Sequence, residues 1–277
     1  MKKLSKKYVF LDVDGTLVDF KSRVADSAVS ALKQAQNNGH KMIIATGRQK
    51  SQIYPWLLEK VQFDGIMASS GAYIEFDGKV IYENHPTKEK LSQVIDFFHE
   101  YKISYFLQSK DALIVEKQCF DDIIAYMRMR GSSESVIKSI FENTVFTENP
   151  KECTYAEKIA YYNAPFGLDG VRKALGDYFY VVGYSIGEAS SAYHGEITFD
   201  GINKGVGIQK FLEAVGAPVS DSIAVGDSEN DLEMIKYAGV GIAMGNGYDV
   251  VKQAADFVTT DINEDGLLNA FKTVGLI

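Results

Sequence analysis

The sequence contains little cysteine and no long hydrophobic run. Its 277 residues include two cysteines, Cys119 and Cys153, which do not form a CxxC pair. A disulfide framework and a thiolate zinc site are therefore not expected. The first apolar run, residues 8–11, is interrupted by Asp12. It is too short for the ~7–15 apolar residues of a secretion signal or the ~18 of a membrane span. We expect a cytoplasmic protein with two reduced thiols.

The chain also has fewer basic than acidic residues. The chain has 29 Lys and Arg against 37 Asp and Glu, a net charge of −8. Such a chain has no overall attraction for nucleic acid or for an anionic membrane. The four histidines are scattered without metal-ligand spacing. Hydrophobic residues make up 46% and charged residues 24%, which is ordinary for a globular protein. The length suits one large or two modest domains.

The two ends of the chain share one pattern of alternating strands and helices. Continuous apolar runs separated by helical periodicity predict a parallel sheet covered on both faces. The expected strands are 8–11, 42–45, 65–68, 222–225, 240–243 and 257–258, and the expected helices are 24–35, 51–60, 205–215, one ending near 238, and 248–255.

The middle of the chain follows a different pattern. Helices are expected at 88–101, 120–130 and 168–175, and strands at 104–108, 113–115, 157–162 and 178–186. These elements do not alternate as βα units, which favours an inserted α+β module with an open antiparallel sheet. We therefore expect an α/β core formed by residues 1–82 and 195–277, with an inserted domain at 83–194.

Acidic side chains follow two of the expected core strands. Asp12 and Asp14 come directly after the first strand, and Asp227 and Asp231 follow the strand at 222–225. The carboxyl ends of parallel strands meet at one edge, where ligands bind. Carboxylates packed together need a cation, and oxygen ligands select Mg²⁺ or Ca²⁺. These four aspartates are the predicted metal-binding residues.

The same edge carries groups suited to an anion. Gly15 allows a tight turn, and we expect the N–H groups of Gly15 and Thr16 to be free for an anion. Thr46, followed by Gly47, offers a hydroxyl at the end of the next strand, and Lys204 begins a helix as a point charge. A metal site, an anion cradle and spare carboxylates together are the inventory of phosphoryl transfer.

Four segments resemble the motifs of a known family. Asp12-Val13-Asp14-Gly15-Thr16-Leu17 resembles motif one of the haloacid dehalogenase superfamily, Thr46-Gly47-Arg48 is similar to motif two, Lys204 within residues 201–205 to motif three, and residues 226–231 to motif four. The insertion between motifs two and three, with the patterns at 243–247 and 263–266, resembles the Cof-type phosphatases of subfamily IIB. The resemblance implies a Rossmann-like core with a parallel sheet and an inserted cap of the C2B type.

The resemblance also implies a role for each motif residue. Asp12 would attack phosphorus to form an aspartyl-phosphate, and Asp14 would protonate the leaving oxygen and later activate water. Mg²⁺ would be held by Asp12, the Asp14 carbonyl and Asp227, with Asp231 and Asn230 in support. The residues expected at the phosphoryl group are Gly15, Thr16, Thr46, Gly47, Lys204 and Asn230.

The expected function is that of a Mg²⁺-dependent phosphatase. Its substrate would be a small organic phosphate monoester, a sugar phosphate or a nucleotide-related metabolite. The expected partner is thus a small phosphorylated metabolite, and the chain is a monomer or homodimer. Two alternatives stay open: a phosphomutase of the phosphomannomutase type, and a non-catalytic protein that binds a phosphate ligand.

Several residues near the motifs have open roles. Arg48 contacts the substrate or forms a structural ion pair, and Asn246 lies near the phosphate or only supports the fold. Many Cof-type sequences carry Asn-Gly-Ala after the third strand, whereas this chain has Ser70-Gly71-Ala72. A polar stretch before the end of the insertion is a further candidate to face the active site: Glu188, Ser190, Ser191 and Tyr193.

Overall fold

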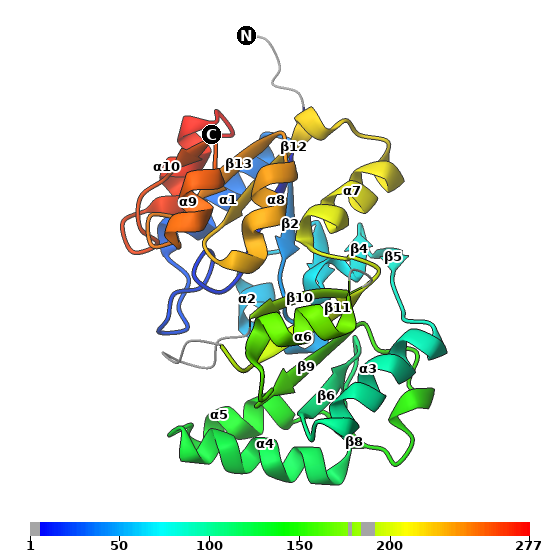
Figure 1. The fold of residues 1–277 in the computed structure, drawn as a ribbon. Helices are drawn as coiled ribbons and strands as arrows, with labels where there is room; N and C mark the ends of the chain where they lie inside the picture. Colours follow the sequence, from blue (N-terminus) through cyan, green and yellow to red (C-terminus); the bar gives the residue numbers. More distant parts are fainter. Residues whose placement is uncertain (1–5, 177–178, 184–191) are drawn as a thin grey trace. The chain divides into compact units, whose positions relative to one another are not determined.

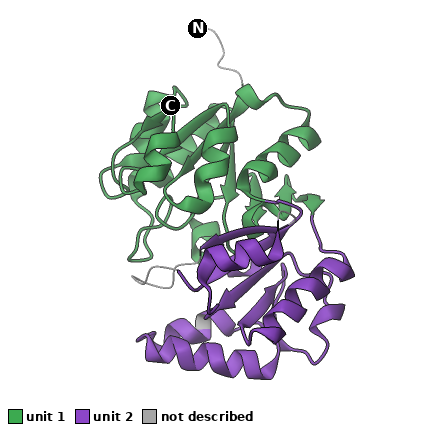
Figure 2. Cartoon of the chain, viewed as in Figure 1, with its two compact units in different colours: residues 1–48, 53–83, 203–277 green, residues 49–52, 84–202 purple. Residues whose placement is uncertain are grey.

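The computed structural model describes residues 6–176, 179–183 and 192–277. The chain forms two compact units, drawn in different colours in Figure 2. Unit 1 consists of residues 1–48, 53–83 and 203–277, and unit 2 of residues 49–52 and 84–202. Both ends of the sequence thus build unit 1, and the predicted α/β fold with an inserted α+β domain is confirmed.

Unit 1 is organised around an eight-stranded sheet with the order β14-β13-β12-β1-β2-β3-β4-β5. The six strands from β14 to β3 are parallel, and β4 and β5 add an antiparallel hairpin. The strands are β1 (Tyr8–Leu11), β2 (Lys41–Ala45), β3 (Gly65–Ala68), β4 (Tyr73–Phe76), β5 (Lys79–Glu83), β12 (Ser222–Gly226), β13 (Val240–Ala243) and β14 (Phe257–Val258). The middle pair of the six parallel strands, β1 and β12, comes from opposite ends of the sequence, which Figure 1 colours from blue at the N-terminal end to red at the C-terminal end.

Helices cover both faces of this sheet. Val9 and Leu11 of β1 join a core with α1 (Asp26–Asn37) and α10 (Gly266–Thr273). Tyr8 and Phe10 point to the other face, because side chains alternate along a strand, and join a core with α7 and α8. Burial on both faces explains why these strands are uninterrupted apolar runs. The other helices of unit 1 are α2 (Pro55–Lys60), α7 (Lys204–Val215), α8 (Leu232–Tyr237) and α9 (Asp249–Ala254), with short 3₁₀ turns η2 (Ser69–Gly71), η4 (Val219–Asp221) and η5 (Glu229–Asp231).

Unit 2 contains a six-stranded sheet with the order β10-β11-β9-β6-β7-β8. Its pairs are antiparallel except that β7 and β8 are parallel, so the predicted antiparallel sheet needs this correction. Side chains of α3 and α6 pack on one face and those of α4 and α5 on the other. The elements are α3 (Lys88–Glu100), β6 (Ser104–Gln108), β7 (Leu113–Val115), α4 (Lys117–Met129), α5 (Glu134–Phe141), β8 (Thr144–Phe146), β9 (Lys158–Tyr162), α6 (Gly167–Leu175), β10 (Phe179–Gly183) and β11 (Gly195–Phe199), with η1 (Lys50–Gln52) and η3 (Pro150–Glu152).

The boundaries of the insertion differ from the expected ones. Residue 83 was expected in the insertion but belongs to unit 1, and residues 49–52 were expected in the core but belong to unit 2. Residues 195–202 were also expected in the core, but the structure includes them in unit 2. The reason is β11, which pairs with both β9 and β10 and is thus an interior strand of the second sheet. Sequence analysis also missed the β4–β5 hairpin. Its turn is an Asp-Gly pair with positive φ at both positions, 48° at Asp77 and 75° at Gly78, which is the sequence signal of such a hairpin.

Two expectations from composition can be compared with the structure. In the structure Cys119 and Cys153 are both free thiols. None of the described helices combines the length and the apolar character that a bilayer crossing requires.

Phe211 of α7 is central to one core of unit 1. Its ring is fully buried and meets the rings of Tyr8, Phe10 and Phe76 at centroid distances of 5.3, 5.1 and 5.0 Å. We expect Phe211→Ala to lower the free energy of unfolding of unit 1 by about 3–5 kcal/mol, because it leaves a cavity. Urea unfolding followed by fluorescence of Trp56, the single tryptophan, measures this.

Phe20 provides the matched control, because its side chain is 83% exposed. Phe20→Ala should change the free energy of unfolding by less than about 0.5 kcal/mol. Equal losses in the two variants would contradict this description of the core.

Candidate active site

Three adjacent parallel strands bring the motif residues to one edge of the unit 1 sheet. Leu11 at the end of β1 lies opposite Val225 of β12 and Ile44 of β2. The chain continues from these strands into Asp12, Asp227 and Thr46. The backbone N–H of Asp12 still donates to the Val225 carbonyl at 3.0 Å, which extends the ladder to the start of the site.

Lys204 lies at the centre of this edge. Its ammonium Nζ is 2.6 Å from Asp12 Oδ1 and 2.5 Å from Asp231 Oδ1, and its side chain is 0% exposed. The lysine is the first residue of α7, and the helix is capped by Asn203, whose side chain accepts the N–H of Val206 at 2.9 Å. The helix cap therefore fixes the position from which the ammonium reaches both carboxylates.

Asp231 connects Lys204 to the end of β12. Its second oxygen, Oδ2, accepts the backbone N–H groups of Asp227 and Ser228 at 3.0 and 2.9 Å. Both carboxylate oxygens are thus engaged within the protein. Asn230 lies on the same 3₁₀ turn, where its side-chain oxygen accepts the Ser228 hydroxyl at 2.8 Å. This local network holds the loop that follows Asp227.

Asp227 and the turn after Asp12 approach each other closely. The Thr16 hydroxyl donates to Asp227 Oδ1 at 2.8 Å. A Cβ atom on Gly15 would lie 2.2 Å from Asp227 Oδ2, and Gly15 has a φ of +92°. A side chain is therefore excluded here both by space and by backbone conformation.

The backbone N–H groups of Gly15 and Thr16, both predicted to be free for an anion, differ in their hydrogen bonding. The Gly15 N–H donates to the Val18 carbonyl at 2.8 Å, so the prediction is wrong for Gly15. The tight turn that the glycine permits uses the N–H to close itself. The Thr16 N–H has no acceptor within the described part of the chain.

The acidic residues of this edge carry more charge than Lys204 balances. One carboxylate oxygen from each of Asp12, Asp227 and Asp231 lies within 4.8 Å of the other two, and all three residues are buried. Burial, with the charge of Asp231, raises the pKa of Asp12 well above its usual range, although Lys204 opposes the change. Burial and Asp231 also raise the pKa of Asp227 to about 7, against the hydrogen bond from Thr16.

Lys204 itself stays charged in this setting. Burial lowers the pKa of its ammonium, but Asp12 and Asp231 outweigh burial and raise it above the usual value. A buried cluster of oxygen donors with excess negative charge fits a hard divalent cation. The donor set therefore suits Mg²⁺ rather than a metal that prefers nitrogen or sulfur.

Asp14 has an environment unlike that of Asp12. Its side chain is 46% exposed and is bound by Arg48 through two hydrogen bonds, of 2.6 Å from Nε and 2.9 Å from Nη2. The Tyr54 hydroxyl also donates to Asp14 at 3.1 Å, and the Arg48 guanidinium lies 4.3 Å from the centre of the Tyr54 ring. The open question about Arg48 is thus answered for this structure, in which it forms an ion pair with Asp14.

Thr46 and Asn246 take different positions around the edge. Thr46 is buried, and its hydroxyl oxygen accepts the Arg48 N–H at 3.1 Å, so the hydroxyl keeps its own hydrogen to donate. Gly47 lies between these two residues. The amide of Asn246 donates to the Gly15 carbonyl at 2.8 Å and accepts the Ile262 N–H at 2.9 Å. Asn246 therefore supports the Gly15 turn with both ends of its amide.

The predicted polar stretch of the insertion is only partly described. Glu188, Ser190 and Ser191 lie outside the described residues. Tyr193 belongs to unit 2 and is 56% exposed.

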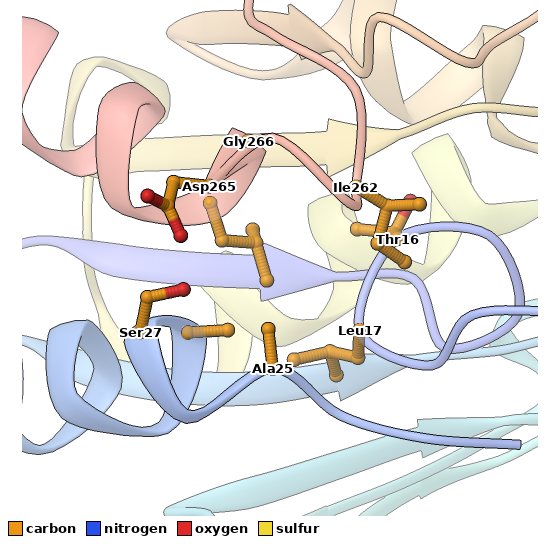
Figure 3. A pocket seen from close by; sticks show the side chains of 9 residues that line it. Thr16, Leu17, Ala25, Ser27, Ile262, Asp265 and Gly266 are labelled. Atoms are coloured by element: carbon orange, nitrogen blue, oxygen red, sulfur yellow. The ribbon is translucent and has the colours of Figure 1, made fainter.

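A small cavity lies beside the Gly15 turn, between the first turns of α1 and α10 (Figure 3). Side chains such as Leu17, Ala25 and Ile262 make its lining largely apolar. Thr16 also lines it, but Asp12, Asp14 and Lys204 do not. The charged groups described above therefore lie outside this cavity.

Comparison with known proteins agrees with this geometry. The family model of the haloacid dehalogenase-like hydrolases matches residues 9–271. This chain belongs to the haloacid dehalogenase superfamily. The match includes all four motifs and the whole insertion, and within the superfamily the chain is a Cof-type phosphatase.

Relatives match the chain over nearly its full length. The 5-amino-6-(5-phospho-D-ribitylamino)uracil phosphatase YitU of Bacillus subtilis is 28% identical, over 97% of this chain and 97% of that protein. The pyridoxal phosphate phosphatase YbhA of Escherichia coli is 27% identical, over 95% of this chain and 97% of that protein. The solved structure of the subclass IIB sugar phosphatase BT4131 superimposes with a TM-score of 0.77 at 25% identity, over 98% of this chain and 100% of that one.

The raised carboxyl pKa values predict how stability depends on pH and on cations. A carboxyl group with a raised pKa in the folded state favours folding at low pH, and this contribution is lost as pH rises toward about 7, the pKa of Asp227. Without divalent cations, the melting temperature should therefore fall between about pH 5 and about pH 8. Mg²⁺ should raise the melting temperature. The increase should be larger at the higher pH, because protons then no longer compete with Mg²⁺ for the carboxylates.

Differential scanning calorimetry with EDTA or with Mg²⁺ tests this. A Mg²⁺ concentration about 100 times its Kd should add about 2.7 kcal/mol to the free energy of unfolding. This corresponds to a rise of several degrees in the melting temperature. Asp227→Asn is the matched variant and should lose most of the Mg²⁺-dependent shift. An equal Mg²⁺ effect at both pH values would contradict the assignment of a cation site.

Proposed function

We propose that this phosphatase hydrolyses a small organic phosphate monoester with Mg²⁺, through an aspartyl-phosphate intermediate. The observation that carries the proposal is the buried Asp12 carboxylate, held by the Lys204 ammonium at 2.6 Å beside two further aspartates. The chemistry needs an ionised, oriented carboxylate next to positive charge. The motif likeness and the phosphatase relatives support the same reaction.

Asp12 is the proposed nucleophile. An oxygen of its carboxylate forms a bond to phosphorus while the bond from phosphorus to the ester oxygen breaks. Lys204 orients the carboxylate and, with the Thr46 hydroxyl, offers positive charge and a hydrogen-bond donor to the phosphoryl oxygens. Water then attacks phosphorus, which releases inorganic phosphate and restores Asp12.

Asp14 is the proposed proton carrier. It gives a proton to the leaving ester oxygen and later takes one from the attacking water, so the two steps balance. Its exposure fits this role, since its protons must exchange with the substrate and with water. Arg48 and Tyr54 hold its side chain at a defined position. We infer that they position Asp14 between turnovers and release it toward the ester.

The proposed Mg²⁺ ligands are the carboxylates of Asp12 and Asp227 and the carbonyl of Asp14. Asp231 completes the acidic cluster, but both of its oxygens already accept hydrogen bonds. We therefore assign Asp231 a positioning role toward Lys204 and the β12 loop. When bound, Mg²⁺ neutralises charge on the transferring phosphoryl group. The other residues proposed around the phosphoryl group are Thr16, Gly47 and Asn230.

The proposed substrates are sugar phosphates or nucleotide-related phosphate esters. YitU is named for a phosphorylated ribityl-aminouracil and BT4131 for sugar phosphates. We propose that unit 2 acts as a cap of the C2B type, which recognises the part of the substrate beyond the phosphoryl group. The net charge of −8 fits a small, freely diffusing anion attracted by one local site rather than a polyanion.

Replacement of the nucleophile tests the covalent route. We expect Asp12→Asn to lower phosphate release from p-nitrophenyl phosphate by at least about 10³-fold, because no carboxylate is left to attack phosphorus. Wild-type release should depend on Mg²⁺. Asp169→Asn, at a side chain that is 93% exposed in unit 2, is the matched control and should keep full activity.

Two results would contradict the proposal. Full activity in Asp12→Asn would exclude the aspartyl-phosphate. Transfer of the phosphoryl group back to a sugar, with no release of inorganic phosphate from any ester, would indicate a phosphomutase.

Replacement of Asp14 should separate the two half-reactions. Nitrophenolate leaves without a proton, so Asp14→Asn should still become phosphorylated by p-nitrophenyl phosphate but should hydrolyse the intermediate slowly. We expect a burst of one nitrophenolate per site, followed by turnover that is about 10²–10⁴-fold slower. Stopped-flow absorbance and mass spectrometry of the phosphorylated protein measure this. Steady turnover at the wild-type rate, with no burst, would show that Asp14 carries no proton.

A further inference from the structure

The turn after β3 lies at the same edge as the motif residues. It is the 3₁₀ turn η2, residues Ser69–Gly71, and two backbone hydrogen bonds connect it to the Thr46 loop. The Ser70 N–H donates to the Thr46 carbonyl at 3.0 Å, and the Ser69 N–H donates to the Arg48 carbonyl at 2.8 Å. The turn is thus attached directly to a loop proposed to bind phosphate.

The backbone of this turn is strained. Ser69 and Ser70 have φ values of +50° and +56°, in the left-handed region that costs free energy for residues other than glycine. Two such residues in succession persist only where surrounding structure fixes them. Strain of this kind gathers at functional sites, so it directs attention to the side chains that it presents.

Packing against α7 is what fixes the turn. A Cβ atom on Gly71 would lie 2.7 Å from the Asn203 carbonyl oxygen and 3.1 Å from Gly207 Cα. The turn therefore lies directly against the first residues of the helix that begins with Lys204. Thr46 on one side and Lys204 on the other are the two groups proposed to hold the phosphoryl oxygens.

The Ser70 hydroxyl has no hydrogen-bond partner among the described residues. The residue is 4% exposed, and its Oγ atom is buried. By contrast, the hydroxyls of Thr16 and Ser228 at the motif loops are hydrogen-bonded within the protein. A buried hydroxyl without a partner is unfavourable and calls for an explanation.

We propose that the Ser70 hydroxyl donates a hydrogen bond to a phosphoryl oxygen of the bound substrate. This inference rests on the proposed function and adds a binding residue that lies outside the four motifs. The Ser70 N–H donates to the Thr46 carbonyl, and the next residue, Gly71, lies against the start of α7. Phosphoryl oxygens are the acceptors expected beside these two elements. A bound phosphate ester would thus supply the partner that the described residues do not.

Ser70→Gly removes the hydroxyl and suits the positive φ. We expect the inhibition constant of inorganic phosphate and the KM for p-nitrophenyl phosphate to rise about tenfold, as for a lost hydrogen bond to a charged group. The kcat should change little, because the contact is made in the ground state and in the transition state alike. The melting temperature should rise, because both strain and the unpartnered hydroxyl are removed.

Ser22→Gly is the matched control. Ser22 is an exposed serine with a φ of +57°, so the substitution relieves similar backbone strain at a place without the proposed contact. It should raise the melting temperature and leave phosphate affinity unchanged. Ser70→Asn is a second variant, since asparagine tolerates the left-handed region and carries an amide donor. It should bind phosphate better than Ser70→Gly.

The outcomes separate this inference from the proposed function. Unchanged phosphate affinity in Ser70→Gly, in an active enzyme, would show a structural hydroxyl and overturn the inference alone. If the wild type hydrolyses no ester but binds phosphate, calorimetric titration with inorganic phosphate still compares the variants and decides the role of Ser70. A wild type that neither hydrolyses esters nor binds phosphate would overturn both.

Discussion

The ion pairs of Lys204 with Asp12 and Asp231 hold together the acidic edge of the unit 1 sheet. The ammonium is fully buried, so water does not solvate it, and a buried charge is tolerated only with partners. Asp12 follows the first strand, Asp231 follows β12 and Lys204 begins α7, so three distant parts of the sequence meet at one charge. Loss of this cation would leave mutually repelling buried carboxylates. The same excess of acid that makes the lysine necessary also makes the edge suitable for a cation.

Close backbone approach is the second constraint on this edge. Gly15 has space for no side chain, because a Cβ atom would lie 2.2 Å from the Asp227 carboxylate. Gly71 likewise lies against Asn203 at the start of α7. Each glycine allows its loop to contact a neighbouring residue, Asp227 or Asn203, and a side chain at the glycine position would prevent that contact. The charge cluster and the strained turn at Ser70 are therefore consequences of one tightly packed set of loops.

The sequence predicted the parallel core and the meeting of strand-end aspartates, because continuous apolar runs and the acidic residues that follow them are local signals. Contacts between distant side chains left no such signal. The Arg48–Asp14 pair was an open alternative, and the Gly15 N–H was expected to be free although the turn uses it internally. β11 was assigned to the wrong unit because its pairing with β9 and β10 is not local. The Ser70 hydroxyl lacks a hydrogen-bond partner among the described residues, and this depends on all of its neighbours in space, so no local sequence signal reveals it.

Asp12 and Asp14 are two residues apart, yet their surroundings are opposite. Asp12 is 4% exposed and bound by an ammonium, whereas the Asp14 side chain is 46% exposed and bound by a guanidinium and a phenol. Strand geometry accounts for the contrast, since the chain leaves the sheet between them through buried Val13 and turns at Gly15. A fixed, desolvated carboxylate suits bond formation to phosphorus, and an accessible one suits exchange of protons with water. The turn at Gly15 thus gives two identical side chains different surroundings, which suits the different roles that the proposed two-step hydrolysis assigns to them.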